Sequence, residues 1–248
     1  MSLLIAMQYR SDFVFNGLTG LLRTAALVGP LLLVFQHRET VSGWTGPEAT
    51  LVMALFLLLS SMTGALMEPN LGAVVEHIRR GTLDLVLLKP ADAQLLVSLS
   101  RVEPSRLWDL PAALLLGGWA LAQMPAPSPW GVIGAIIAVL SGLAAMYGLW
   151  LLAICTSFYF VQVDNLRFLL MSASEAGRWP LSLFSGWLRV VLLVAVPVGV
   201  VTTLPAELLR GRGSWEMVAT AVAVGTGFLV VSRLAWRRAL ASYTSASS

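Results

Sequence analysis

Long apolar segments alternate with short polar stretches along the chain. A membrane-spanning helix needs about 20 mostly apolar residues, and six segments approach this requirement. They cover residues 18–35, 47–67, 108–124, 130–157, 181–204 and 215–236. The third is the shortest, and the fourth is longer than a bilayer requires, so it should tilt or project beyond the membrane. The pattern predicts an all-α integral membrane protein, with six transmembrane helices in a single domain over residues 1–248.

The composition supports this class. Of the 248 residues, 57% are hydrophobic and 12% are charged, whereas about 25% charge is usual in soluble domains. The net charge of +3 comes from basic residues scattered at the edges of apolar segments, which is not the clustered patch that nucleic-acid binding requires. Cys155 is the single cysteine, so no intrachain disulfide forms, and its apolar neighbours favour packing as a small hydrophobe.

Residues 1–16 precede the first span. They carry no positive region before their apolar residues and no small-residue cleavage pattern, so they do not read as a signal peptide. We expect an interfacial helix that leads into the first span.

The loops differ in charge between the two sides of the membrane. Eleven Lys and Arg residues lie in the loops and terminal segments on one side, whereas the other side carries only Arg38, Arg210 and Arg212. Short loops rich in Lys and Arg stay in the cytoplasm. Both termini and the 68–107 loop are therefore predicted to be cytosolic.

Two arginines fall inside predicted spans. Arg23 lies within two turns of the end of the first span, so its guanidinium can extend to the cytosolic interface. Arg189 lies deeper, about nine residues into the fifth span, where an isolated charge is costly. Arg189 is therefore a candidate for a transport path, although a structural partner or a lipid phosphate would also explain it.

The chemistry of several other classes is missing. All Asp and Glu residues fall in loops or at span ends, which disfavours a built-in relay for ion-driven transport. The two histidines, His37 and His77, fall on opposite sides of the membrane, so we expect neither a metal site nor a histidine-based triad. No catalytic residue is assigned. The chain also lacks the GxxxxGK[ST] sequence that cradles ATP phosphates, so it cannot bind ATP by that route and energy must come from elsewhere.

The 68–107 loop contains the most distinctive polar sequence, EHIRRGTLDLVLLKP over Glu76–Pro90. Leu71, Val74 and Ile78 recur at helical spacing, with charged residues between them, which predicts an amphipathic helix that can lie along a membrane surface. Gly81 follows as a left-handed C-cap.

This loop resembles the signature of ABC transporter type-2 permeases, which reads roughly acid, Arg, Gly-Thr-Leu-acid, Leu-Leu and Pro between the second and third spans. The matching residues are Glu76, Arg79, Gly81, Thr82, Leu83, Asp84, Leu87, Leu88 and Pro90. The overall layout is also similar, with about 250 residues, six spans, a short interfacial N-terminus and cytosolic termini.

The resemblance implies a function. In such permeases the loop that corresponds to residues 68–107 carries a coupling helix, which docks into a separate cytosolic ABC ATPase subunit. The docking residues here would be Glu76, Arg79, Arg80, Gly81, Thr82 and Asp84. ATP and Mg²⁺ would bind to that partner, so this chain needs no cofactor. The resemblance further implies export, a homo- or heterodimer of permeases, contact with membrane lipids, and the cytoplasmic (inner) membrane of a prokaryote.

One feature departs from many of these permeases, which carry a sizeable extracellular insertion or re-entrant helical pair before the last span. Here only residues 205–213 separate the last two apolar segments. Pro197 breaks a helix interior, so Val198–Leu204 is a candidate for a shortened version of that element.

Other functions remain open from the residues alone. The main alternative is a non-transporting membrane scaffold or sensor that recruits a cytosolic partner through the 68–107 loop. An intramembrane enzyme is disfavoured, because the acids and histidines that would carry its chemistry are missing from the spans.

Overall fold

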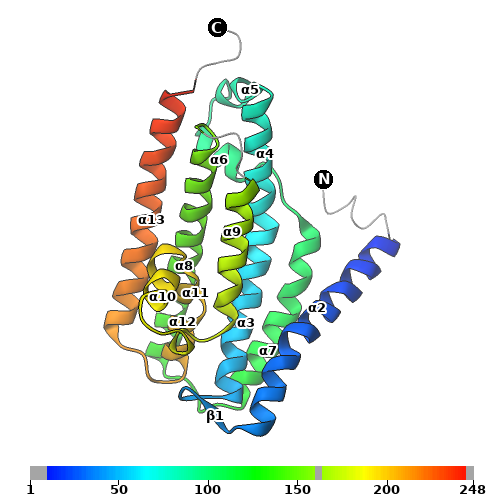
Figure 1. The fold of residues 1–248 in the computed structure, drawn as a ribbon, viewed down its shortest axis with the longest axis vertical. Coiled ribbons are helices and arrows are strands. Elements are labelled where there is room, and N and C mark those ends of the chain that lie inside the picture. The colour runs from blue at the N-terminus through cyan, green and yellow to red at the C-terminus, as the bar shows by residue number, and fades with distance from the viewer. Residues whose placement is uncertain (1–9, 160–163, 244–248) are drawn as a thin grey trace.

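The computed structural model describes residues 10–159 and 164–243. Its long helices run side by side, and a short two-stranded ribbon closes one end (Figure 1). In chain order the elements of the first half are α2 Arg10–His37, β1 Thr40–Val41, β2 Trp44–Thr45, α3 Gly46–Met62, the π-helical turn η1 Thr63–Met67, α4 Glu68–Arg79, α5 Asp84–Leu87, α6 Ala93–Ser98, the 3₁₀ turn η2 Pro104–Trp108 and α7 Asp109–Ala122.

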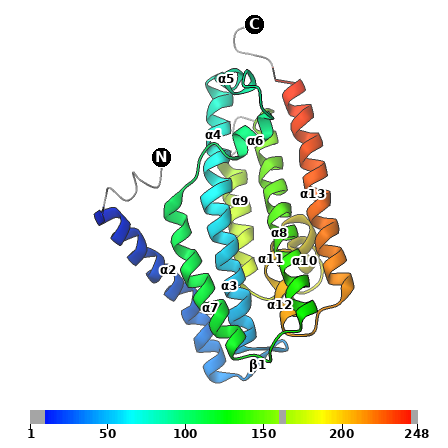
Figure 2. The same ribbon diagram turned by 180° about the vertical axis from the view of Figure 1, so that it is seen from behind.

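The second half begins with the long helix α8 and ends with the long helix α13, and short elements lie between them. These elements are α8 Pro129–Thr156, α9 Asp164–Ser174, the 3₁₀ turns η3 Glu175–Arg178 and η4 Leu181–Leu183, α10 Trp187–Val190, the π-helical turn η5 Val191–Ala195, α11 Val198–Val201, α12 Thr203–Leu209 and α13 Trp215–Ala241. We call the end of the bundle that holds α5 and the last turn of α13 the α4–α6 end, and the opposite end the β1–β2 end (Figures 1 and 2).

Four helices in the described residues are long and apolar enough to cross a membrane. They are Leu18–His37, Gly46–Arg79, Pro129–Thr156 and Trp215–Ala241. A bent pair, Trp187–Ala195 with Val198–Leu209, raises the count to five if it is taken as one span. The chain is thus a multi-pass, all-α membrane protein, but the predicted count of six spans is not confirmed.

The predicted third span, residues 108–124, is shorter in the structure than the sequence indicated. It forms α7, which has only 14 residues, too few for the roughly 20 that a bilayer requires. Trp108 before it belongs to a 3₁₀ turn, and Gln123 after it caps the helix. α7 packs along the longer helix α3, which supports it.

The predicted fifth span is broken rather than straight. Gly186 has a φ of +56° before α10, and the chain bends by 73° at Val196–Pro197. Pro197 has no backbone N–H to donate and its ring crowds the preceding turn, which explains the break. Val198–Leu204 consequently lies in the second arm of a bent pair, and its assignment as a shortened re-entrant element stays a prediction.

The segment after α8 is also different from the polar loop that the sequence indicated. α9 and η3 lie along the bundle in both ribbon views, beside α3 and α8 (Figures 1 and 2). Leu170 is buried there, and Glu175 pairs with Arg178 at 3.7 Å. These two charges therefore lie along the bundle and not at its end.

Small residues bring α8 and α13 into close contact. A Cβ atom on Gly148 would lie 2.8 Å from the backbone of Phe228, and one on Gly225 would lie 2.6 Å from the carbonyl oxygen of Ser141. No side chain fits at these distances, so glycine permits the two backbones to approach as they do in many membrane bundles.

A charged network fastens the β1–β2 end. The Arg210 guanidinium donates two hydrogen bonds to the carboxylate of Glu207, at 2.7 and 2.8 Å. It also donates to the carboxylate of Glu48 at 3.2 Å and to the carbonyl oxygen of Gly43 at 3.1 Å. Its guanidinium carbon lies 3.7 Å from the ring centroid of Trp44. The Arg210 side chain is only 6% exposed. One arginine therefore ties α12 to α3 and to the β1–β2 turn.

Candidate functional site

The predicted docking segment continues the second span. α3, η1 and α4 form a single helix over Gly46–Arg79. The segment therefore continues α3 along the bundle, and its position along a membrane surface stays a prediction. The amphipathic pattern of α4 has a cause within the protein, because Leu71 and Val74 are buried in the main core with residues of α8 and α13. The apolar face packs on protein and not on lipid.

Gly81 ends α4 as predicted. Its φ is +65°, its N–H donates to the carbonyl of Ile78 (3.2 Å), and the N–H of Thr82 donates to the carbonyl of His77 (2.9 Å). These two bonds define a Schellman cap. A hydrogen bond of 2.8 Å between His77 Nδ1 and Thr82 Oγ1 reinforces the turn. The chain is thus held in a reversal that leads into α5.

The remaining predicted docking residues gather around this reversal. Glu76 and Arg80 form an ion pair one helical turn apart, and both are well exposed. Arg79 is also exposed. Asp84 begins α5, where a negative charge is favourable. The turn therefore presents two adjacent arginines at the α4–α6 end of the protein.

Exposed leucines adjoin these charges. Leu83 is fully buried and anchors the turn, while Leu85 and Leu88 are 64% and 80% exposed. A cavity of about 540 Å³ lies between α4, α5 and α6, and Leu95 and Leu99 are among its lining residues. Residues 68–100, which we call the α4–α6 tip, hence combine an apolar surface with a basic edge. The LVLL run indicated apolar character, but the sequence did not tell which leucines are buried.

The α4–α6 tip is clamped to two long helices. Arg233 of α13 donates to Asp92 (3.1 Å) and to Gln94 Oε1 (2.7 Å), and Gln94 Nε2 donates to the hydroxyl of Tyr147 on α8 (3.0 Å). Ser98 also bonds that hydroxyl, at 2.7 Å. We call these five residues the α6 clamp. It was missed from the sequence because its members lie far apart in the chain.

The clamp is charged at neutral pH. The hydrogen bond from Arg233 lowers the pKa of Asp92 from 3.8 to about 2. A group with a lowered pKa stabilises the folded state above its unfolded value, so this contribution is complete above pH about 4 and disappears as the pH falls toward 2. The clamp therefore does not respond to pH changes near neutrality.

Arg23, which was predicted to extend to the cytosolic interface, pairs with Asp109 at the start of α7. It also donates to Ser60 Oγ of α3 (3.4 Å). Nearby, Arg106 lies 4.0 Å from Glu68. Both acids were expected in loops or at span ends. Asp109 begins α7, whereas Glu68 lies inside the continuous Gly46–Arg79 helix. Both are largely buried against the arginines, which offsets the cost of placing charge in the bundle.

Arg189, the predicted transport-path residue, bonds to backbone carbonyls. Its Nε donates to Leu181 (3.2 Å) and its Nη2 to Ser182 (3.4 Å). This is a local structural role, because the guanidinium caps the η4 turn just before α10. A transport role for Arg189 stays a prediction. Among the described residues, no group of three or more His, Cys, Asp or Glu side chains is arranged to hold a metal ion.

Comparison with known proteins places the chain in a family. A search of curated proteins and a search of solved structures found no match. A family model described as "ABC-2 family transporter protein" matches residues 21–247, which is nearly the whole chain and includes the α4–α6 tip. This agrees with the resemblance drawn from the Glu76–Pro90 sequence. The chain belongs to the ABC-2 family of transporter proteins.

Proposed function

We propose that this chain is the transmembrane permease of an ATP-driven exporter, and that the α4–α6 tip receives a separate cytosolic ABC ATPase subunit. ABC-2 permeases associate with ABC ATPases in general. The observation that carries the proposal is the tip itself, which exposes Leu85, Leu88 and two arginines while its α6 segment is fixed to α8 and α13. Such a tip can both bind a partner and pass its movement to the bundle.

The orientation follows from the distribution of charge. Arg79, Arg80 and Lys89 lie in the tip, and Arg237 and Arg238 lie in the last turns of α13 at the same end. Basic residues at one end favour the cytoplasmic side. We therefore place the α4–α6 end in the cytoplasm of a prokaryotic cell and the β1–β2 end outside, with both termini cytosolic.

Energy would enter through the tip. ATP and Mg²⁺ would bind only to the partner, and closure of two ATPase subunits would move the tips of two permeases, which form a homo- or heterodimer. A movement of this kind shifts the bundle between states only if the partner interacts more favourably with one of them. Gly81 fixes the turn and Leu83 anchors it. A movement of the tip would therefore displace the helices of the bundle, because the turn itself does not deform.

The energy source gives a direct test. The purified chain alone should hydrolyse no ATP above background, since it lacks the GxxxxGK[ST] sequence. An ATPase that carries this sequence should copurify with the chain and hydrolyse ATP, as judged by mass spectrometry of the complex and by phosphate release. A partner with its phosphate-binding lysine replaced is the control, since it should bind but not hydrolyse. Hydrolysis by the isolated chain would refute the proposal, and copurification of a partner without an ATP site would favour a scaffold or sensor.

The α6 clamp gives a second prediction. Arg233→Ala should release α6 from α8 and α13, so hydrogen exchange of the amides of residues 93–98 should become severalfold faster, because locally opened segments exchange sooner. The ATPase should still bind, but the permease should no longer alter its hydrolysis rate. Arg237→Ala, one turn further along the exposed side of α13, serves as the control. Unchanged exchange in Arg233→Ala would show that the clamp does not hold α6.

A further inference from the structure

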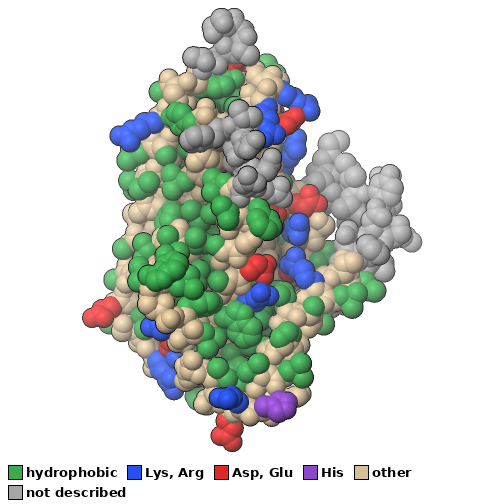
Figure 3. Space-filling model, in the orientation of Figure 1, with side chains coloured by type: hydrophobic (Ala, Val, Ile, Leu, Met, Phe, Trp, Pro, Cys, Tyr) green, Lys and Arg blue, Asp and Glu red, His purple; other side chains and the backbone are tan. Residues whose placement is uncertain are grey.

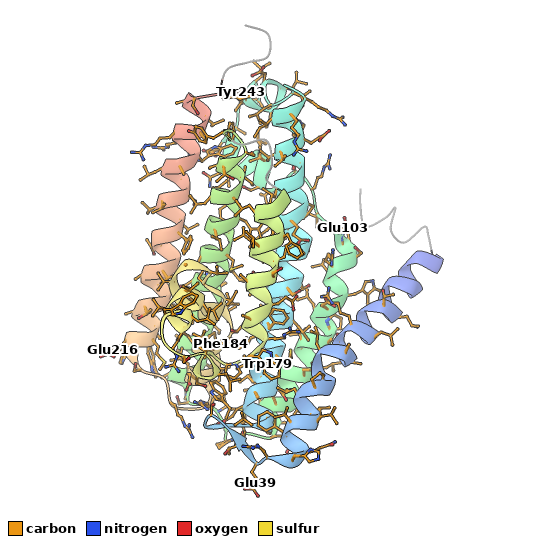
Figure 4. The ribbon with its side chains drawn as sticks, viewed as in Figure 1. Glu39, Glu103, Trp179, Phe184, Glu216 and Tyr243 are labelled. Carbon is orange, nitrogen blue, oxygen red and sulfur yellow. The ribbon has the colours of Figure 1, made fainter. Side chains whose placement is uncertain are left out.

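A polar cavity opens on the side of the bundle, beside the first turns of α4 and separate from the cavity between α4, α5 and α6. It has a volume of about 590 Å³ and lies between α2, α4, η2 and the start of α7. Its charged lining residues are Arg23, Arg106, Glu68, Glu103 and Asp109. Figure 3 shows acidic and basic side chains gathered on the face between α9 and α2, and Figure 4 places Glu103 near the end of α7 that is remote from Glu39. A cavity of this size suits a small-molecule group.

The arginines of the cavity are less enclosed than the acids that they pair with. The side chains of Arg23 and Arg106 are 40% and 44% exposed, whereas those of Asp109 and Glu68 are 6% and 9% exposed. The 4.0 Å separation of Arg106 from Glu68 is too long for a direct hydrogen bond. Arg23 Nε is buried and has no hydrogen-bond partner among the residues that the structure describes. Both guanidinium groups therefore keep donors for a further acceptor.

The charges favour a particular class of ligand. Two arginines suit a phosphate, because guanidinium groups bind phosphate oxygens in a bidentate manner. The three carboxylates in the same lining would repel a ligand that carried only negative charge. Glu103 is exposed, and its carboxylate accepts a hydrogen bond from the Ser105 hydroxyl, so it can also receive an ammonium group. A ligand that carries both a phosphate and an ammonium group therefore matches both the arginines and the carboxylates of the cavity.

We propose that this cavity binds the headgroup of a zwitterionic phospholipid of the phosphoethanolamine type, with its phosphate at Arg23 and Arg106 and its ammonium near Glu103 and Glu68. The acyl chains of the lipid would extend from the cavity along α2, where Leu18 and Leu22 are exposed. In the proposed orientation the cavity lies near the cytosolic ends of α2 and α7, at the level of the inner headgroups. Binding to the isolated chain needs no ATPase, so this inference can fail or hold separately from the proposed export function.

A steric plug tests the site without changing its charges. Gly72 lines the cavity, and a Cβ atom there would meet nothing within 4 Å. Gly72→Trp should fill the cavity without a clash in the helix. Gly227→Trp is the matched control, since Gly227 of α13 is also open but lies outside this lining. Thermal unfolding of both variants establishes that they fold.

Native mass spectrometry of the purified chain in detergent, titrated with short-chain phosphatidylethanolamine, phosphatidylglycerol or soluble phosphoethanolamine, measures binding. Phosphatidylethanolamine should bind about tenfold tighter than phosphatidylglycerol, and Gly72→Trp should weaken its binding about tenfold, which is the scale of one charge-assisted contact. Gly227→Trp should change it less than about twofold. Equal binding of the two lipids, or full binding by Gly72→Trp, would overturn the proposal.

A second variant keeps the test decisive if Gly72→Trp unfolds. Glu103→Gln removes the expected ammonium partner at an exposed position, so the preference for phosphatidylethanolamine over phosphatidylglycerol should fall severalfold while both lipids still bind. An unchanged preference counts against the assignment. Binding of soluble phosphoethanolamine without any binding of the lipid would refute a lipid source.

Discussion

Arg210→Ala should destabilise the protein by about 3 to 5 kcal/mol, because it leaves two largely buried carboxylates, Glu48 and Glu207, without their cation. The substitution also removes the stacking of the guanidinium on Trp44. Since this one side chain joins α12 to α3 and to the β1–β2 turn, the loss should affect the whole β1–β2 end. The midpoint of thermal unfolding in detergent should fall by on the order of 10 °C.

Arg212 provides the control for this prediction. It lies two residues away, is exposed, and donates to the same carbonyl oxygen of Gly43 at 3.3 Å. Arg212→Ala should change stability by less than about 0.5 kcal/mol, as is usual for surface positions. Arg210→Lys should give an intermediate loss, since lysine keeps the charge but not the two-pronged contact with Glu207. Equal stability of Arg210→Ala and Arg212→Ala would mean that the network contributes nothing to the fold.

The double substitution Arg79→Glu with Arg80→Glu should release the ATPase. Charge-assisted contacts contribute about 1.5 to 3 kcal/mol each, so losing two weakens docking by about two to four decades if they are additive. The new acids would also repel Glu76, the present partner of Arg80, and place negative charge at the C-terminal end of α4, where it is unfavourable. Copurification of the ATPase with the variant measures the effect.

The matched control is Arg237→Glu with Arg238→Glu. These two adjacent, exposed arginines lie near the end of α13, so the reversal changes the charge at the same end of the protein by the same amount. It should leave ATPase binding intact. Single cysteines at Ser42 and Ser242, in a Cys155→Ser background, should show that a membrane-impermeant thiol reagent labels only Ser42→Cys from outside in both variants. Normal ATPase binding after the charge reversal of Arg79 and Arg80 would mean that these arginines do not dock the ATPase and only hold the tip on the cytosolic side.

Features that depend on local chemistry could be predicted from the sequence. Uninterrupted apolar runs locate α8 and α13, because a long uncharged segment in a membrane has to satisfy its backbone hydrogen bonds internally and so forms a helix. Gly81 is predicted as a cap because glycine adopts positive φ at little cost. The order of residues from Glu76 to Pro90 indicated the family that the match over residues 21–247 shows.

Contacts between groups that are distant in the chain depend on how the helices pack, and the sequence did not predict them. The apolar face of α4 could pack on lipid or on protein with the same sequence pattern, and its burial in the core decides for protein. The pairs Arg23 with Asp109 and Arg233 with Asp92 join residues 86 and 141 positions apart. Hydropathy is averaged over one segment of the sequence, so it does not show which side chains on different helices pair with each other. Charges inside a bundle find their partners through packing, and packing alone placed the arginines and acids of the lateral cavity together.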